Sequence, residues 1–205
     1  ENCLNYIKID YNENIGLGAD GAESPGEGLR RQMEKVVEFF EKLRAGVKGL
    51  VMEVCSSGGM RHEPLFMTLG SMVSFSDAHE NADGAVVAAD LHRVMQPRTM
   101  QIWASVLPTH TLDEVYFTMV KAMLGRICLS GRLSDVSPEV FSVVKAGVDY
   151  YRTIKEIVKD GETILIDTDE IRSLRHPKGI VRLARRSGDG NRLLCYGFAY
   201  GETER

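Results

Sequence analysis

Short apolar runs alternate with amphipathic stretches along most of the chain. The apolar runs have the length and bulky residues of buried strands, and they lie at residues 6–9, 49–55, 72–78, 100–106 and, more weakly, 125–131. Between them, apolar residues recur every three or four positions, as on one face of a helix, at residues 28–46, 84–95 and 112–124. This alternation predicts parallel strands joined by right-handed crossovers, hence an α/β sheet or barrel.

The pattern changes after a long amphipathic helix predicted at residues 137–161. Three short apolar runs follow at residues 162–168, 179–186 and 192–200, and turn residues rather than helices separate them. Strands connected in this way usually pair antiparallel. We therefore predict two domains, an α/β part over residues 1–160 and a small antiparallel β-domain over residues 161–205.

Composition and charge exclude several classes of protein. The chain has 205 residues, 43% of them apolar and 26% charged, which is enough to bury a core. Its net charge is -4, and acids and bases are interspersed, so nucleic acid is not an expected partner. No apolar run is long enough to span a bilayer, and no signal peptide is recognisable. We expect a cytoplasmic protein without a membrane partner and, because the chain starts at Glu1 and enters a strand at once, a fragment of a longer polypeptide.

Polar residues gather where the predicted parallel strands end. They are Lys8 and Asp10 on the first strand, Glu53 and Cys55 on the second, and Ser76 and Asp77 on the third. In barrels and open α/β sheets, the carboxyl ends of the strands hold the residues of the active site. Carboxylates on successive strands therefore predict a site at this edge.

Each of these features also has a simpler interpretation. Asp10 could cap the turn that follows its strand. Residues 55–59, "CSSGG", could form a flexible turn or a phosphate-binding nest of backbone amides, although the GxxxxGK[ST] pattern of a nucleotide loop is missing. Asp77, His79 and Glu80 could be solvated loop residues or ligands of a metal ion.

Three motifs, taken together in this order, resemble one family. They are "KIDYN" at residues 8–12, "EVCSSGGMR" at residues 53–61 and "FSDAHE" at residues 75–80. The first is similar to the nucleophile motif of glycoside hydrolase family 36, the retaining α-galactosidases and their relatives. The second is similar to that family's Glu-x-Cys-x-x-Gly-Gly-x-Arg motif, and the third to its Ser-Asp acid/base motif. Residues 96–108 and 122–133 also look like later barrel strands of the family.

The resemblance implies the second half of a (β/α)₈ TIM-type barrel followed by a small β-domain. It implies a retaining glycosidase of terminal α-galactosides, in which Asp10 is the nucleophile and Asp77 the acid/base. Such hydrolysis needs two carboxyl groups about 5–5.5 Å apart and no metal or organic cofactor. The residues implied to bind the sugar are Lys8, Asn12, Cys55, Ser57, Gly58, Gly59 and Arg61.

The partners implied are an oligosaccharide or glycoside substrate, the missing N-terminal half of the same enzyme and further copies of the chain. Half a barrel has open strand edges, so we expect the isolated fragment to self-associate and to be inactive.

The sequence departs from the family's usual pattern at the pocket. Ile9 stands where the family usually has Trp, "RHEP" at residues 61–64 replaces Arg-Phe-Asp, and "SDAHE" at residues 76–80 is less acidic than usual. An α-N-acetylgalactosaminidase, a raffinose-type galactosyl transferase and a non-catalytic sugar-binding relative are the alternatives. A barrel enzyme that uses "SSGG" to hold a phosphorylated substrate is a further one.

Overall fold

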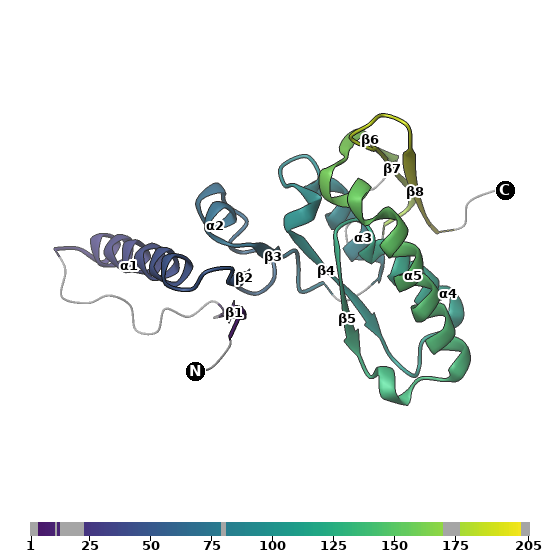
Figure 1. Cartoon of the computed structure of the whole chain (residues 1–205), viewed down its shortest axis with the longest axis horizontal. Helices are drawn as coiled ribbons and strands as arrows, with labels where there is room; N and C mark the ends of the chain where they lie inside the picture. The colour runs from purple at the N-terminus through teal and green to yellow at the C-terminus, as the bar shows by residue number, and fades with distance from the viewer. Residues whose placement is uncertain (1–3, 11, 13–22, 79–80, 170–176, 202–205) are drawn as a thin grey trace. The chain divides into compact units, whose positions relative to one another are not determined.

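The computed structural model describes residues 4–10, 12, 23–78, 81–169 and 177–201. The chain forms two compact units, residues 1–77 and residues 78–205, whose helices and strands are labelled in Figure 1. His79 and Glu80, two of the three residues considered as metal ligands, lie outside the described residues. Within the described part of the chain, no helix combines the length and the apolar character needed to cross a membrane.

The described residues of the first unit form three parallel strands and two helices. Their order is β1 (Tyr6–Asp10), α1 (Pro25–Gly46), β2 (Val51–Cys55), α2 (Pro64–Leu69) and β3 (Met72–Ser74). Strand β2 pairs with β1 on one side and with β3 on the other. The core of this unit includes Phe40 of α1 and Phe66 of α2, whose rings meet edge to face at 5.5 Å.

Local signals explain where the two helices of this unit begin. Ser24 caps α1 by accepting a hydrogen bond from the Glu27 backbone N–H, and Pro25 stands in the first turn, where its missing N–H costs nothing. The predicted helix started three residues later, at Gly28. Helix α2 was not predicted, because its six residues are too few to show a helical period. Glu63 caps it through the backbone N–H groups of Leu65 and Phe66.

The second unit continues the alternation and then changes to an antiparallel sheet. Its elements are α3 (Asn81–Leu91), the 3-10 turn η1 (Pro97–Thr99), β4 (Met100–Val106), α4 (Leu112–Ala122), β5 (Arg126–Gly131), the 3-10 turn η2 (Leu133–Asp135), α5 (Pro138–Asp160), β6 (Glu162–Asp169), β7 (Gly179–Arg186) and β8 (Leu193–Tyr200). Strands β4 and β5 are parallel, whereas β6, β7 and β8 pair antiparallel in that order. Helix α4 packs on β4 and beside α5 (Figure 1).

A buried arginine joins the end of α5 to the antiparallel sheet. Arg185 of β7 is 2% exposed, and its guanidinium donates to the backbone oxygens of Ile157, Val158 and Gly161 and to the hydroxyl of Thr163. The last carbonyls of a helix have no partner within the helix. Arg185 supplies that partner from the sheet.

The predicted fold class is confirmed, with local differences. Parallel strands alternate with helices, and an antiparallel sheet follows α5. The third predicted strand, residues 72–78, ends earlier, since β3 stops at Ser74. The predicted boundary between residues 160 and 161 lies within the second unit and stays a prediction.

Candidate active site

The register of β1 and β2 brings the predicted site residues of these strands onto one face. Lys8 lies opposite Glu53, and Asp10 lies opposite Cys55. Directly paired residues of neighbouring strands point to the same side of a sheet, and side chains alternate along each strand. Asp10 is the last residue of β1 and Cys55 the last of β2, so the carboxylate and the thiol stand at the carboxyl edge.

Lys8 bridges two carboxylates on this face. Its Nζ atom lies 3.5 Å from Oε1 of Glu53 and 3.6 Å from Oδ2 of Asp10. The Glu53 side chain is 3% exposed, whereas that of Asp10 is 38% exposed. Tyr6 lies two residues before Lys8 on the same face, and its hydroxyl donates a hydrogen bond to Oε2 of Glu53. The cluster therefore runs from a buried acid, through a half-buried ammonium, to an accessible acid.

The charge states follow from this arrangement. Burial lowers the pKa of Lys8, but Cys55, Glu53 and Asp10 raise it by more, so its pKa lies above the ordinary value. Burial raises the pKa of the Cys55 thiol, and the Gly58 backbone N–H and the Lys8 charge offset this only in part. Cys55 is thus neutral at neutral pH, where its charge effect on Lys8 is absent, and Glu53 and Asp10 are then the acids within 3.6 Å of the Lys8 Nζ atom.

The turn after β2 connects the three motifs. Ser57 and Gly58 have positive φ angles of 40° and 74°, and the Ser57 backbone N–H donates to the Asn12 side-chain oxygen over 2.8 Å. A Cβ atom on Gly58 would lie 2.2 Å from the backbone N of Asp77 and 2.6 Å from the Cα of Ser76. The absence of a side chain at Gly58 therefore allows the backbone that carries Asp77 to approach this turn.

We expect Gly58→Ala to displace the segment that carries Asp77 and to lower the activity of an enzyme containing this chain by about 100-fold, the usual effect of a shift near 1 Å in a reacting group. Gly49→Ala is the matched control, because Gly49 has a φ of 78° but no atom within 4 Å of its would-be Cβ. Thermal unfolding and steady-state kinetics of both variants check this. Equal effects of the two substitutions would show that backbone strain alone, and not contact with Asp77, matters at Gly58.

The remaining predicted site residues lie in the same turn. Arg61 is buried, donates to the Cys55 carbonyl and stacks over the Phe66 ring at 5.7 Å. These contacts hold the turn on β2, and a contact of Arg61 with sugar stays a prediction. A Cβ atom on Gly59 would lie 3.2 Å from the Phe75 carbonyl, so Gly59 also packs closely on the chain after β3.

Two polar residues of the cluster had no predicted role. Glu53 was noted only as a strand-end acid and as part of a motif, and Tyr6 as part of an apolar run. The signal for Glu53 was an acid within the buried run "VMEVC", since acids are almost never fully buried without a partner. Nothing in the sequence identified Lys8 and Tyr6 as its partners, because the contact depends on the register of two strands far apart in the chain.

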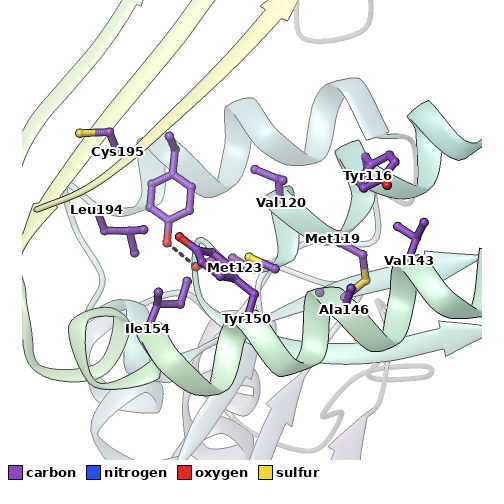
Figure 2. Close-up of a pocket in the computed structure, with 12 residues that line it drawn as sticks. Tyr116, Met119, Val120, Met123, Val143, Ala146, Tyr150, Ile154, Leu194 and Cys195 are labelled. Carbon is purple, nitrogen blue, oxygen red and sulfur yellow. Dashed lines mark hydrogen bonds between the residues drawn. The ribbon is translucent and has the colours of Figure 1, made fainter.

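A pocket in the second unit shares none of these residues. It has a volume of about 390 Å³ and is lined by α4, α5 and β8, with Tyr116, Met119 and Val120 facing Val143, Ala146 and Tyr150 (Figure 2). The Tyr196 hydroxyl closes one side by donating to the Met123 carbonyl over 2.7 Å. Its lining residues are mostly apolar, and Asp, Glu, His, Lys and Arg are missing from them.

The parallel strands with polar carboxyl ends, followed by an antiparallel sheet, define an α/β barrel segment with a β-domain. The sequence matches the family model described as melibiase over residues 1–161, and the chain belongs to this family. No curated protein sequence matches it.

Solved structures support the same fold. The galactosidase domain of the alpha-galactosidase-sucrose kinase AgaSK is 17% identical, with a TM-score of 0.80 over 98% of this chain and 27% of that chain. The alpha-galactosidase AgaA from Geobacillus stearothermophilus is 17% identical, with a TM-score of 0.84 over 98% of this chain and 28% of that one. The alpha-galactosidase from Lactobacillus brevis is 18% identical, with a TM-score of 0.78 over 94% of this chain and 26% of that one. The chain thus spans about a quarter of the length of these structures.

Proposed function

We propose that this chain is part of a retaining glycoside hydrolase that cleaves terminal α-galactosides, with Asp10 as nucleophile and Asp77 as general acid and base. The observation that carries the proposal is the Lys8-paired carboxylate of Asp10 at the carboxyl end of a parallel strand, in a chain of the melibiase family. The packing of Gly58 against the backbone of Asp77 links the second carboxylate to the turn after the neighbouring strand.

The reaction proceeds in two displacements. The ionised Asp10 attacks the anomeric carbon while the protonated Asp77 gives its proton to the departing glycosidic oxygen, and a glycosyl ester on Asp10 results. Asp77, now ionised, takes a proton from water as that water attacks the ester, which frees the sugar and restores both carboxyl groups. Lys8 holds the Asp10 carboxylate in the orientation for attack, and its ammonium is the proposed donor to sugar hydroxyls.

Structures of related enzymes support the class of substrate. Variants of the Geobacillus stearothermophilus enzyme AgaA have been solved in complex with raffinose, with stachyose and with 1-deoxygalactonojirimycin. These ligands are bound by those proteins. At 17% to 18% identity, they favour galactosides for this chain without selecting one oligosaccharide.

The stereochemistry of hydrolysis tests the proposal. A polypeptide that carries these 205 residues together with the first half of a barrel should hydrolyse an aryl α-galactoside, and proton NMR should detect the α-anomer of galactose first, because two inversions give net retention. The isolated chain should leave the substrate intact. First release of the β-anomer would rule out a nucleophilic Asp10, and hydrolysis of a phosphate ester instead would favour the anion-nest interpretation of "SSGG".

A further inference from the structure

Glu53 is a buried acid for which the two-carboxylate mechanism has no use. It is 2% exposed and lies in the middle of β2 between the buried residues Met52 and Val54. Its partner on β3 is the apolar Met72. Burying a carboxylate costs several kcal/mol unless it is paired and hydrogen-bonded, so a fold that needed only packing here would be better served by an apolar residue.

Among the described residues, the polar partners of the Glu53 side chain are Tyr6 and Lys8, on the strand that carries the proposed nucleophile. Oε2 of Glu53 accepts a hydrogen bond from the hydroxyl of Tyr6. Oε1 receives no hydrogen bond from the described residues, and the Nζ atom of Lys8 lies 3.5 Å away. The same Nζ atom lies 3.6 Å from Asp10, so the ammonium is nearly equidistant from the two acids.

We propose that Glu53 is a positioning residue for the nucleophile: it holds the Lys8 ammonium by competing with Asp10 for it, so that Lys8 orients the Asp10 carboxylate without pairing so closely that its attack is weakened. This rests on the proposed function, in which Asp10 is the nucleophile. The cluster of Glu53, Lys8 and Asp10 combines two acids with one ammonium, and its accessible end is the carboxyl group of Asp10.

The need for such a counter-charge follows from the covalent step. When Asp10 forms the glycosyl ester it loses its charge, and Lys8 then stands beside an anomeric carbon that becomes cationic again in the next transition state. Without Glu53, an uncompensated ammonium would oppose that charge. With Glu53 in place, the Lys8–Glu53 pair is neutral throughout the cycle, and the Tyr6 hydroxyl fixes the orientation of the carboxylate.

The test is Glu53→Gln in the enzyme that contains this chain, with the pH dependence of kcat/KM as the main readout. We expect kcat/KM to fall by roughly 10- to 100-fold, as when the outer partner of a site residue is removed. The acidic limb of the profile, which reports ionisation of the attacking carboxylate, should move to lower pH. Removal of a nearby anion, and closer pairing of Lys8 with Asp10, both favour the charged form of that carboxylate.

On the described part of β1 and β2, the other titratable side chains of this face are Tyr6 and Cys55, and the substitution alters neither of them. Glu38→Gln is the matched control, because Glu38 also pairs with a lysine, Lys35 at 2.6 Å, but on the exposed surface of α1. It removes the same charge and should leave rate and profile unchanged. Tyr6→Phe keeps the Glu53 charge and should lower the rate without moving the acidic limb.

A Glu53→Gln enzyme that folds and has the parental rate and profile would overturn the positioning role. A lower rate with an unmoved acidic limb would also reject it, because a structural defect alone gives that result. If Glu53→Gln does not fold, Glu53→Asp, which keeps the charge, is tested in its place. If neither variant folds, Glu53 is needed for folding, and the positioning role is rejected. The proposed function is tested separately, by the activity of the parental enzyme and by the loss of that activity in its Asp10→Ala variant.

Discussion

In an enzyme that contains this chain, replacement of Asp10 by alanine is expected to lower kcat by about 10⁴-fold or more. This is the size of effect seen when a covalent nucleophile is removed from a hydrolase. In the proposed mechanism, no glycosyl ester forms without this carboxylate, and the direct attack of water has no positioned partner. Folding should change little, because the Asp10 side chain is 38% exposed at a strand end and its ion pair with Lys8 spans 3.6 Å. Steady-state kinetics and thermal unfolding measure the two effects.

Azide should restore part of the lost activity. It is small enough to enter the space left by the carboxylate and to attack from the same face, giving the β-galactosyl azide, inverted relative to the substrate. Asp149→Ala is the control, since Asp149 is also ion-paired and half exposed but lies on α5. A parental rate in Asp10→Ala, or rescue to the α-azide, would remove Asp10 from the proposed mechanism.

Replacement of Asp77 by alanine should separate substrates by their leaving groups. A glycoside with a poor leaving group needs a proton to depart, so its kcat/KM should fall by about 10²–10⁴-fold, the usual contribution of a general acid. An activated aryl galactoside departs without a proton and should lose much less in the first step. Parallel assays of raffinose and a nitrophenyl galactoside measure this difference.

The control for that experiment is Asp135→Ala, which removes another exposed, partly paired acid from η2 in the second unit. It should affect both substrates equally or not at all. An Asp77→Ala enzyme that is equally slow on both substrates would show that Asp77 does not protonate the leaving group. Such a result would leave the role of Asp10 untouched.

The sequence predicted the long, periodic elements well. Helix α5 was predicted within a residue of its ends because apolar positions recur over its 23 residues and Ser137 precedes Pro138 at its start. Helix α2 was missed because six residues show no period. The end of β3 was placed too late because Phe75 is buried beyond the last residue of the strand, Ser74, and a buried residue extends an apolar run without extending the strand.

The order of the predicted strands indicated which residues lie near the candidate site, but not which of them contact each other. Acids after successive strands pointed to Asp10 and Asp77, since parallel strands end at one edge. The pairing of Lys8 with Glu53 depends on the register of β1 and β2, which neither strand shows by itself. The approach of Gly58 to the Asp77 backbone is likewise a contact in space, and the glycine alone indicated only a turn.

Arg185 limits how the protein can be cut or recombined. Its guanidinium, carried by β7, satisfies the carbonyl groups at the end of α5, so the helix and the sheet share one set of hydrogen bonds. Ending the polypeptide at Asp160 would leave those carbonyls without their donor. Transplanting the sheet alone would leave Arg185 with the Thr163 hydroxyl of β6 but without the carbonyl acceptors of α5. A junction for gene fusion or domain exchange should therefore lie before α5, so that α5 and the antiparallel sheet are transferred together.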